Sequence, residues 1–144
     1  MWSRLSARSR TNAVWFINQD CEPQLAQMNL AIGTGGVPVW MPAGGISGLG
    51  YSTLFGRPVV AIEQCSTVGT VGDIILADFT QYWAIDKGAP GGDFTSSIHV
   101  QFLTDETAFR ATYRADYRPM WTSALTPFKG SNTVSPFVVL ATRS

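Results

Sequence analysis

Thr-Ala-Phe-Arg-Ala-Thr-Tyr-Arg-Ala-Asp-Tyr-Arg, residues 107–118, alternates between two kinds of side chain. Odd-numbered positions from 109 to 117 hold aromatic residues and alanines, whereas even-numbered positions hold charged or polar residues. Successive side chains of a β-strand point to opposite sides, so a strand here has one apolar and one charged face. In an α-helix, the arginines would separate the aromatic residues from the alanines, and no continuous apolar stripe would form. The pattern therefore predicts a strand.

The preceding stretch also alternates, but in the opposite phase. Ile98, Val100 and Phe102 occupy even-numbered positions, and a bulge, twist or turn across residues 104–107 would account for the change. If both halves form one strand, about 20 residues at roughly 3.3 Å each give a ribbon on the order of 65 Å long. Ordinary strands have only about 5–6 residues. A ribbon of this length favours a protein of an extended assembly over an enzyme.

Composition sets the first limits on function. The 144 residues fit one domain, or one domain with a short appendage. Charged residues make up 14%, against about 25% in an average soluble domain, while the chain holds five Trp, eight Phe and four Tyr. Either partners cover part of this apolar surface or the core is unusually well filled.

Charge and cysteine content exclude further classes of protein. Ten basic and ten acidic residues balance to zero, which argues against binding nucleic acid through bulk charge. No apolar run approaches the ~18 residues of a membrane-spanning helix, and the first ten residues lack the apolar core of a signal peptide. Cys21 and Cys65 lack metal-ligand spacing. We expect a soluble intracellular protein with reduced thiols, although one disulfide stays open as an alternative.

Short apolar runs between turns predict an α+β fold that is rich in strands. Strands are expected at 12–18, 37–41, 54–62, 73–78, 79–86 (after a helical turn) and 137–142. Short helices are expected at 2–10 and 20–28, the second capped by Asp20 with Pro23 in its first turn. Residues 87–92 hold three glycines and one proline, and are the best candidate for a domain boundary.

Few residues suggest catalysis. His99, the single histidine, lies within the alternating stretch, and Ser96 and Ser97 are too close in sequence to face it well, so we interpret it as a partly solvated strand residue. Asp73 and Asp78 fall on opposite sides of a short predicted strand and cannot converge as a carboxylate pair. Capping or turn hydrogen bonds explain them better.

Binding sites for small ligands find equally little support. Gly-Ile-Ser-Gly-Leu-Gly at residues 45–50 evokes a phosphate-binding loop, but its spacing is reversed and no basic residue follows. We interpret residues 42–50 as a surface loop. Four tryptophans in separate segments fit core packing better than a stacking platform for sugars or bases. They are Trp15, Trp40, Trp83 and Trp121.

The arginines of the predicted strand leave three interpretations open. Arg110, Arg114 and Arg118 lie on its charged face. They could clamp an anionic ligand, face a neighbouring subunit, or face solvent.

Four segments taken in order carry a resemblance to a known family. They are Thr-Leu-Phe-Gly-Arg-Pro-Val-Val (53–60), Val-Gly-Asp-Ile-Ile-Leu-Ala-Asp-Phe-Thr-Gln-Tyr (71–82), Thr-Ala-Phe-Arg-Ala-Thr-Tyr-Arg (107–114) and Val-Ser-Pro-Phe-Val-Val-Leu (134–140). Together with the apolar run at 12–18, they resemble the C-terminal half of tailed-bacteriophage major capsid proteins, which have the Hong Kong 97-like fold. The likeness covers nearly the whole chain.

The resemblance implies a division of the chain. Residues 1–93 would form an axial domain, whose loops gather at the symmetry axes of the shell, and 94–144 the returning strands of a peripheral domain. In the family, an N-terminal arm, an extended loop and a long spine helix precede this region, and no counterpart is found in this sequence. The spine helix would normally cover the apolar side of residues 109–117, so we expect that side to have a substitute partner, such as another copy of the chain.

We therefore predict a structural subunit, or a fragment of one, of a phage or prophage head shell that self-associates through shape-complementary surfaces. It would be made in the host cytoplasm and located in the virion, with no catalytic, cofactor or metal site and no specific nucleic-acid, membrane or small-molecule partner. The candidate interface residues are Arg110, Arg114, Arg118, Tyr113, Tyr117, Gly45 and Gly48. The alternative is a small ligand- or glycan-binding module that uses the scattered tryptophans and the 42–50 loop.

Overall fold

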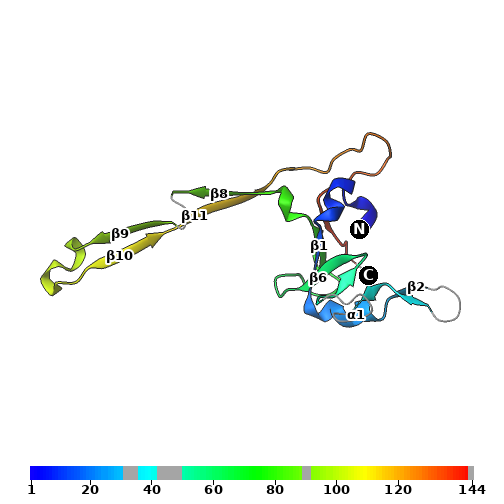
Figure 1. Cartoon of the computed structure of the whole chain (residues 1–144), viewed down its shortest axis with the longest axis horizontal. Helices are drawn as coiled ribbons and strands as arrows, with labels where there is room; N and C mark the ends of the chain where they lie inside the picture. Colours follow the sequence, from blue (N-terminus) through cyan, green and yellow to red (C-terminus); the bar gives the residue numbers. More distant parts are fainter. Residues whose placement is uncertain (31–35, 42–49, 89–91, 143–144) are drawn as a thin grey trace. The chain divides into compact units, whose positions relative to one another are not determined.

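The computed structural model describes residues 1–30, 36–41, 50–88 and 92–142. Strands dominate, accompanied by a short α-helix and several 3-10 turns, which confirms the predicted α+β class. The chain divides into two compact units (Figure 1). The first unit comprises residues 1–81 and 121–144, and the second comprises residues 82–120.

Within the described residues, a six-stranded sheet organises the first unit. Its strands in spatial order are β12 (Phe137–Val139), β7 (Ile74–Ala77), β1 (Val14–Ile17), β6 (Arg57–Ala61), β5 (Thr53–Leu54) and β4 (Trp40–Met41). Strand β1 runs parallel to β6 and antiparallel to β7. The predicted strands at 12–18, 54–62, 73–78 and 137–142 are confirmed within a few residues at their ends.

The core of the first unit lies against β1 and β7. Burial alternates along β1, where Trp15 and Ile17 are buried and their neighbours are partly exposed. Leu76 of β7 is fully buried beside them. The indole Nε1 of Trp15 donates a hydrogen bond of 3.0 Å to the Leu54 carbonyl, so the polar atom of this buried ring is satisfied.

The predicted helix over residues 2–10 is wrong in one respect. Two 3-10 helices, η1 (Trp2–Arg4) and η2 (Ala7–Thr11), replace it. Leu5, between them, is extended with φ −73° and ψ 134°, is buried, and forms a bridge with Ser135. Burial of Leu5 against the sheet therefore interrupts the helix.

The second predicted helix is confirmed with a different cap. It consists of η3 (Gln19–Cys21) followed by α1 (Glu22–Ala26), with Pro23 in the first turn as predicted. Asp20 is not the capping residue, because the side chain of Asn18 accepts the hydrogen bond of the Asp20 amide at 3.0 Å. Asn is as good a cap as Asp, so sequence preference could not separate the two.

Shorter elements complete the first unit. Strand β2 (Asn29–Leu30) pairs with β3 (Val37–Pro38), and the 3-10 turn η4 (Phe79–Gln81) follows β7. The predicted strand at 37–41 is thus divided between β3 and β4, and the predicted helical turn after Asp78 is confirmed.

The second unit is a two-stranded β-ribbon, which Figure 1 shows as a hairpin. Strand β8 (Tyr82–Lys87) pairs antiparallel with β11 (Arg114–Pro119), and β9 (Asp93–Ser97) pairs antiparallel with β10 (Ala108–Thr112). Lys87 stands opposite Arg114 and Asp93 stands opposite Thr112. Tyr113 therefore lies between the two ladders, at the break that separates β10 from β11.

The predicted strand over residues 98–102 is wrong. The 3-10 segment η5 (His99–Thr104) takes its place, and Asp105 has a left-handed backbone with φ 54°. The chain reverses here, so residues 98–118 do not form one continuous strand. The strand predicted at 107–118 is confirmed as β10 and β11. The alternating positions at 98–102 lie within the reversal itself, so their phase is unrelated to that of β10 and β11.

The compact units divide the chain at other points than the glycine-rich segment 87–92. Because β8 pairs with β11, residues 82–93 belong with the ribbon, whereas β12 pairs with β7 in the six-stranded sheet. The candidate boundary at 87–92 thus falls inside the second unit, at the end of β8 and before β9.

Candidate interaction surface

One side of the ribbon carries exposed aromatic rings, which we call the aromatic face: Phe109, Tyr113 and Tyr117. Their exposed fractions are 83%, 58% and 54%. Alternation along β10 and β11 places them on one side, as predicted. Within the described part of the single chain this side is exposed, and the expected cover by a substitute partner stays a prediction. Contiguous exposed apolar surface of this kind is typical of interaction sites.

A cross-strand hydrogen bond fixes one of these rings. The Tyr113 hydroxyl donates to Asp86 Oδ1 at 2.9 Å, although Asp86 lies directly opposite Ala115. This bond to a carboxylate, with a smaller contribution from Tyr117, raises the pKa of Tyr113 to about 12. Tyr113 is therefore protonated at neutral pH and remains a hydrogen-bond donor.

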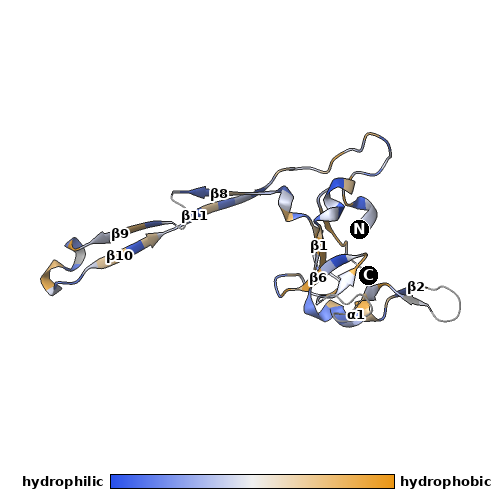
Figure 2. Cartoon of the chain, in the orientation of Figure 1, coloured by the Kyte–Doolittle hydropathy of each residue, from blue (hydrophilic) through white to orange (hydrophobic). Residues whose placement is uncertain are grey.

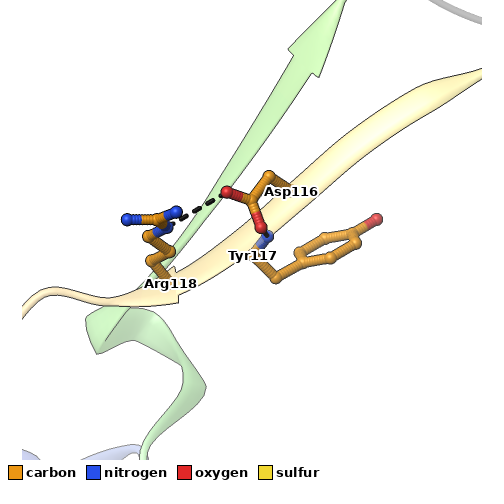
Figure 3. A network of polar contacts seen from close by, with 3 residues as sticks. All are labelled: Asp116, Tyr117 and Arg118. Carbon is orange, nitrogen blue, oxygen red and sulfur yellow. Dashed lines mark hydrogen bonds and ion pairs between the residues drawn. The ribbon is translucent and has the colours of Figure 1, made fainter.

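The opposite side of the ribbon is charged, and Arg118 there is paired within the chain. Its Nε donates to Asp116 Oδ2 at 3.0 Å, and Asp116 Oδ1 accepts from the Tyr117 amide at 2.9 Å (Figure 3). Figure 3 also shows the Tyr117 ring pointing away from this pair. Both charged groups are largely exposed, so the pair adds little to stability.

Arg110 and Arg114 line a hollow in the charged side, which we call the cationic hollow. It has a volume of about 570 Å³, and Lys87 and Asp93 also line it. Within the described residues, no carboxylate oxygen lies within ion-pair distance of Lys87, Arg110 or Arg114. The structure therefore brings two of the three predicted arginines together with Lys87, while Arg118 is engaged elsewhere.

The turn between β9 and β10, residues 98–107, is called the hairpin tip. Phe102 and Leu103 are 73% and 99% exposed, and Asp105 and Glu106 follow them, also exposed. Figure 2 shows strongly hydrophobic and strongly hydrophilic residues side by side in this turn. The tip thus presents apolar and acidic groups together.

His99 lies in the hairpin tip rather than in a strand. Its side chain is exposed, and the Ser97 hydroxyl accepts a hydrogen bond from the His99 backbone amide at 3.2 Å. Among the described residues there is no cluster of His, Cys, Asp and Glu suited to a metal ion. No nucleophile–base pair is formed at His99.

Several other predicted site residues have structural surroundings. Asp73 Oδ2 accepts from the Gly69 amide at 2.9 Å, and Asp78 Oδ1 accepts from the Thr80 amide and hydroxyl at 3.0 and 2.6 Å. The predicted turn-stabilising roles of both aspartates are confirmed. Gly45 and Gly48, with residues 42–49, lie outside the described residues.

Within the first unit, the tryptophans of the alternative interpretation form no platform, because among the described residues no ring contact joins Trp15, Trp40 and Trp121 to one another. Trp15 instead stacks on Trp2, with ring centroids 6.5 Å apart. Trp15 is buried and Trp40 packs against the core while partly buried, so the expectation of core packing holds for these two and not for Trp83 or Trp121.

The two cysteines are buried thiols that form no disulfide with each other. Burial, and to a lesser extent the proximity of Cys21 and Asp73, raises the pKa of Cys65 above its ordinary value. A neutral thiol is a poor nucleophile. The separate thiols agree with the expectation of reduced cysteines.

Comparison with known proteins identifies the family. The family model described as the phage capsid family matches residues 1–130. The chain belongs to the phage capsid family. No curated protein and no solved structure matched it in the corresponding searches.

Membership of the phage capsid family gives the chain a structural role in the phage head and places it in the virion capsid. The family is structural and not enzymatic, and its members point to assembly with other capsid subunits. In the part of the chain that the structure describes, no helix has the length and apolar character needed to cross a membrane.

Two residues that line the hollow, Lys87 and Phe94, and the acidic hairpin tip were not predicted from the sequence as parts of an interaction surface. Residues 87–92 were interpreted as a domain boundary, which separated Lys87 from the strand that it faces. The sequence did contain a signal for this pairing. Two extended stretches, residues 82–87 and 93–97, flank the glycines, and both can pair with residues 108–119.

Proposed function

We propose that this capsid-family chain acts by self-association, and that the β-ribbon of residues 82–120 supplies much of the contact surface. Its site residues on the ribbon are Tyr113, Tyr117, Arg110 and Arg114. The observation that carries the proposal is the exposure of the aromatic face in the single chain. An isolated hairpin is marginally stable in water, so a partner that covers one side also stabilises the ribbon itself.

The fold type follows from the same proposal. We assign the first unit to the axial part and the ribbon to the peripheral part of the C-terminal half of a Hong Kong 97-like subunit. The resemblance of residues 53–60, 71–82 and 107–114 supports this assignment. The limits that we propose for the peripheral part are those of the ribbon, rather than residue 93, because β12 lies in the six-stranded sheet.

The remaining expectations complete the proposed role. The subunit is made in the host cytoplasm, carries out no catalysis, and binds no nucleic acid specifically. The structural, non-enzymatic character of the family supports the absence of catalysis. The balanced charge of the chain argues against nucleic-acid binding through bulk charge.

Size-exclusion chromatography with light scattering tests the proposal. The wild-type chain should increase in mean mass as its concentration rises through the micromolar range. A chain that remains strictly monomeric at high micromolar concentration contradicts self-association.

A second candidate, a ligand-binding module, is favoured by one observation. The first unit has an open apolar pocket of about 680 Å³, whose lining includes Trp2, Trp15, Leu25 and Phe55. Pockets of this size and character accommodate small molecules. Saturable quenching of tryptophan fluorescence by one member of a glycan or nucleotide panel would support this function, whereas a capsid subunit should show none.

A further inference from the structure

We propose that the hairpin tip of one copy inserts its carboxylates, Asp105 and Glu106, into the cationic hollow of a second copy. The inference rests on the proposed self-association and names the two surfaces that form one contact.

The hollow carries more positive than negative charge, because Lys87, Arg110 and Arg114 line it together with one carboxylate, that of Asp93. Lys87 and Arg114 stand directly opposite each other in the β8–β11 pair, and Arg110 lines the same hollow. Like charges directly opposite on a sheet destabilise it. Because no carboxylate oxygen among the described residues lies within ion-pair distance of these three groups, an incoming anion would remove a repulsion as well as form new bonds.

The chemistry of the hollow favours carboxylates. Each guanidinium group offers a planar pair of donors that matches the two oxygens of a carboxylate, and Lys87 adds a mobile ammonium group. A volume of about 570 Å³ accommodates two acidic side chains.

The hairpin tip offers the complementary group. Asp105 and Glu106 are adjacent and exposed, and the left-handed backbone of Asp105 sets them at the chain reversal. In the structure they form no ion pair with Arg110, Arg114 or Lys87 of their own copy.

A tip-to-hollow contact is heterologous, so repeated copies form a ring or an extended lattice, as a shell requires.

Reversing the charges of each surface tests the contact. The hollow variant carries Arg110→Glu and Arg114→Glu, and the tip variant carries Asp105→Lys and Glu106→Lys. The matched control carries Lys129→Glu and Glu63→Lys, which reverse exposed charges of the first unit. Sedimentation velocity measures the association of each full chain alone and of the first two mixed in equal amounts. Circular dichroism checks that each variant retains its β structure.

We expect association to weaken more than tenfold in each of the two variants alone, because charge reversal opposes like groups, and to recover in their mixture. Added salt should weaken the wild-type association, and the control should behave as wild type.

Unchanged association in either variant, or a mixture that does not recover, overturns the inference and leaves the proposed self-association intact. If only the hollow variant loses association, the hollow binds a different anion, such as a nucleic-acid phosphate, and the inference is also overturned. If the wild-type chain does not associate at all, the proposed self-association is contradicted as well.

Discussion

The Tyr113 hydroxyl donates a hydrogen bond of 2.9 Å to the Asp86 carboxylate across the two strands of the ribbon. Tyr113 lies between β10 and β11, and its neighbours Thr112 and Arg114 are the last residues paired in the two ladders. The bond therefore adds a side-chain link across the ribbon beside the end of the β8–β11 ladder.

This relationship predicts an alkaline titration. The pKa of Tyr113 is raised to about 12, so the hydroxyl donates below its ordinary pKa of 10.0, and the contribution of the bond is lost as the pH rises through about 12. Asp86→Asn removes the negative charge and should lower the pKa of Tyr113 toward 10.0. Ultraviolet absorbance of ionised tyrosine measures the change. Asp105→Asn, at the hairpin tip, is the matched control, and identical titrations of wild type and Asp86→Asn would contradict the account.

Asp78 should stabilise the turn after β7 through its side chain. It is almost fully buried, and Oδ1 accepts two hydrogen bonds from Thr80. Asp78→Ala leaves both donors without this acceptor and should lower the free energy of unfolding by about 1–3 kcal/mol. Asp78→Asn keeps the acceptor and should cost less. Urea unfolding gives both values, and equal losses would argue against the hydrogen-bonding role.

Leu76 should contribute strongly to the core of the first unit. Its side chain is fully buried in β7, between β1 and β12. Leu76→Ala should lower the free energy of unfolding by about 2–5 kcal/mol, because it removes buried methyl groups and leaves a cavity. Val139→Ala, on the neighbouring strand at 49% exposure, is the control and should cost clearly less. A comparable effect of the two substitutions would place the core elsewhere.

Cys65 should make the first unit sensitive to alkali. Its pKa is raised, chiefly by burial, so the folded state favours the neutral thiol. The corresponding stability is fully present below the ordinary thiol pKa of 9.0 and is lost as the pH rises through the higher folded value. Cys65→Ala should flatten this alkaline decline in unfolding experiments. A decline of equal steepness in the variant would show that the thiol is not its cause.

The extended stretches could be predicted because local pattern and tertiary environment agree there. The apolar runs that became β1 and β7 reflect burial in the core, whereas the alternation at 107–118 reflects two chemically different sides of a ribbon that is exposed in the single chain. The same pattern misled at residues 98–102, where a spacing of two coincides with a short 3-10 turn. The reversal depends on Asp105, one of the few non-glycine residue types that adopts a left-handed backbone readily, and the sequence offers no glycine there to reveal it.

The interaction surface was predicted only in part, because it combines residues of both strands of the ribbon. The arginines and tyrosines of one strand follow from alternation, but their partners come from the other strand of the ribbon. Lys87 and Asp86 reach this surface only through the register that the reversal at 98–107 sets. A register between distant segments depends on the whole fold, which local sequence preference does not contain.

Hydroxyl-radical footprinting of the aromatic face tests the central claim most directly. Oxidation of Phe109, Tyr113 and Tyr117 is measured by mass spectrometry in dilute and in concentrated protein, with Phe128, which is 99% exposed and lies in the first unit, as the reference. The account predicts that all three rings react readily when dilute and become protected relative to Phe128 as copies associate. Rings that react equally at both concentrations, in samples that light scattering shows to be associated, would contradict it.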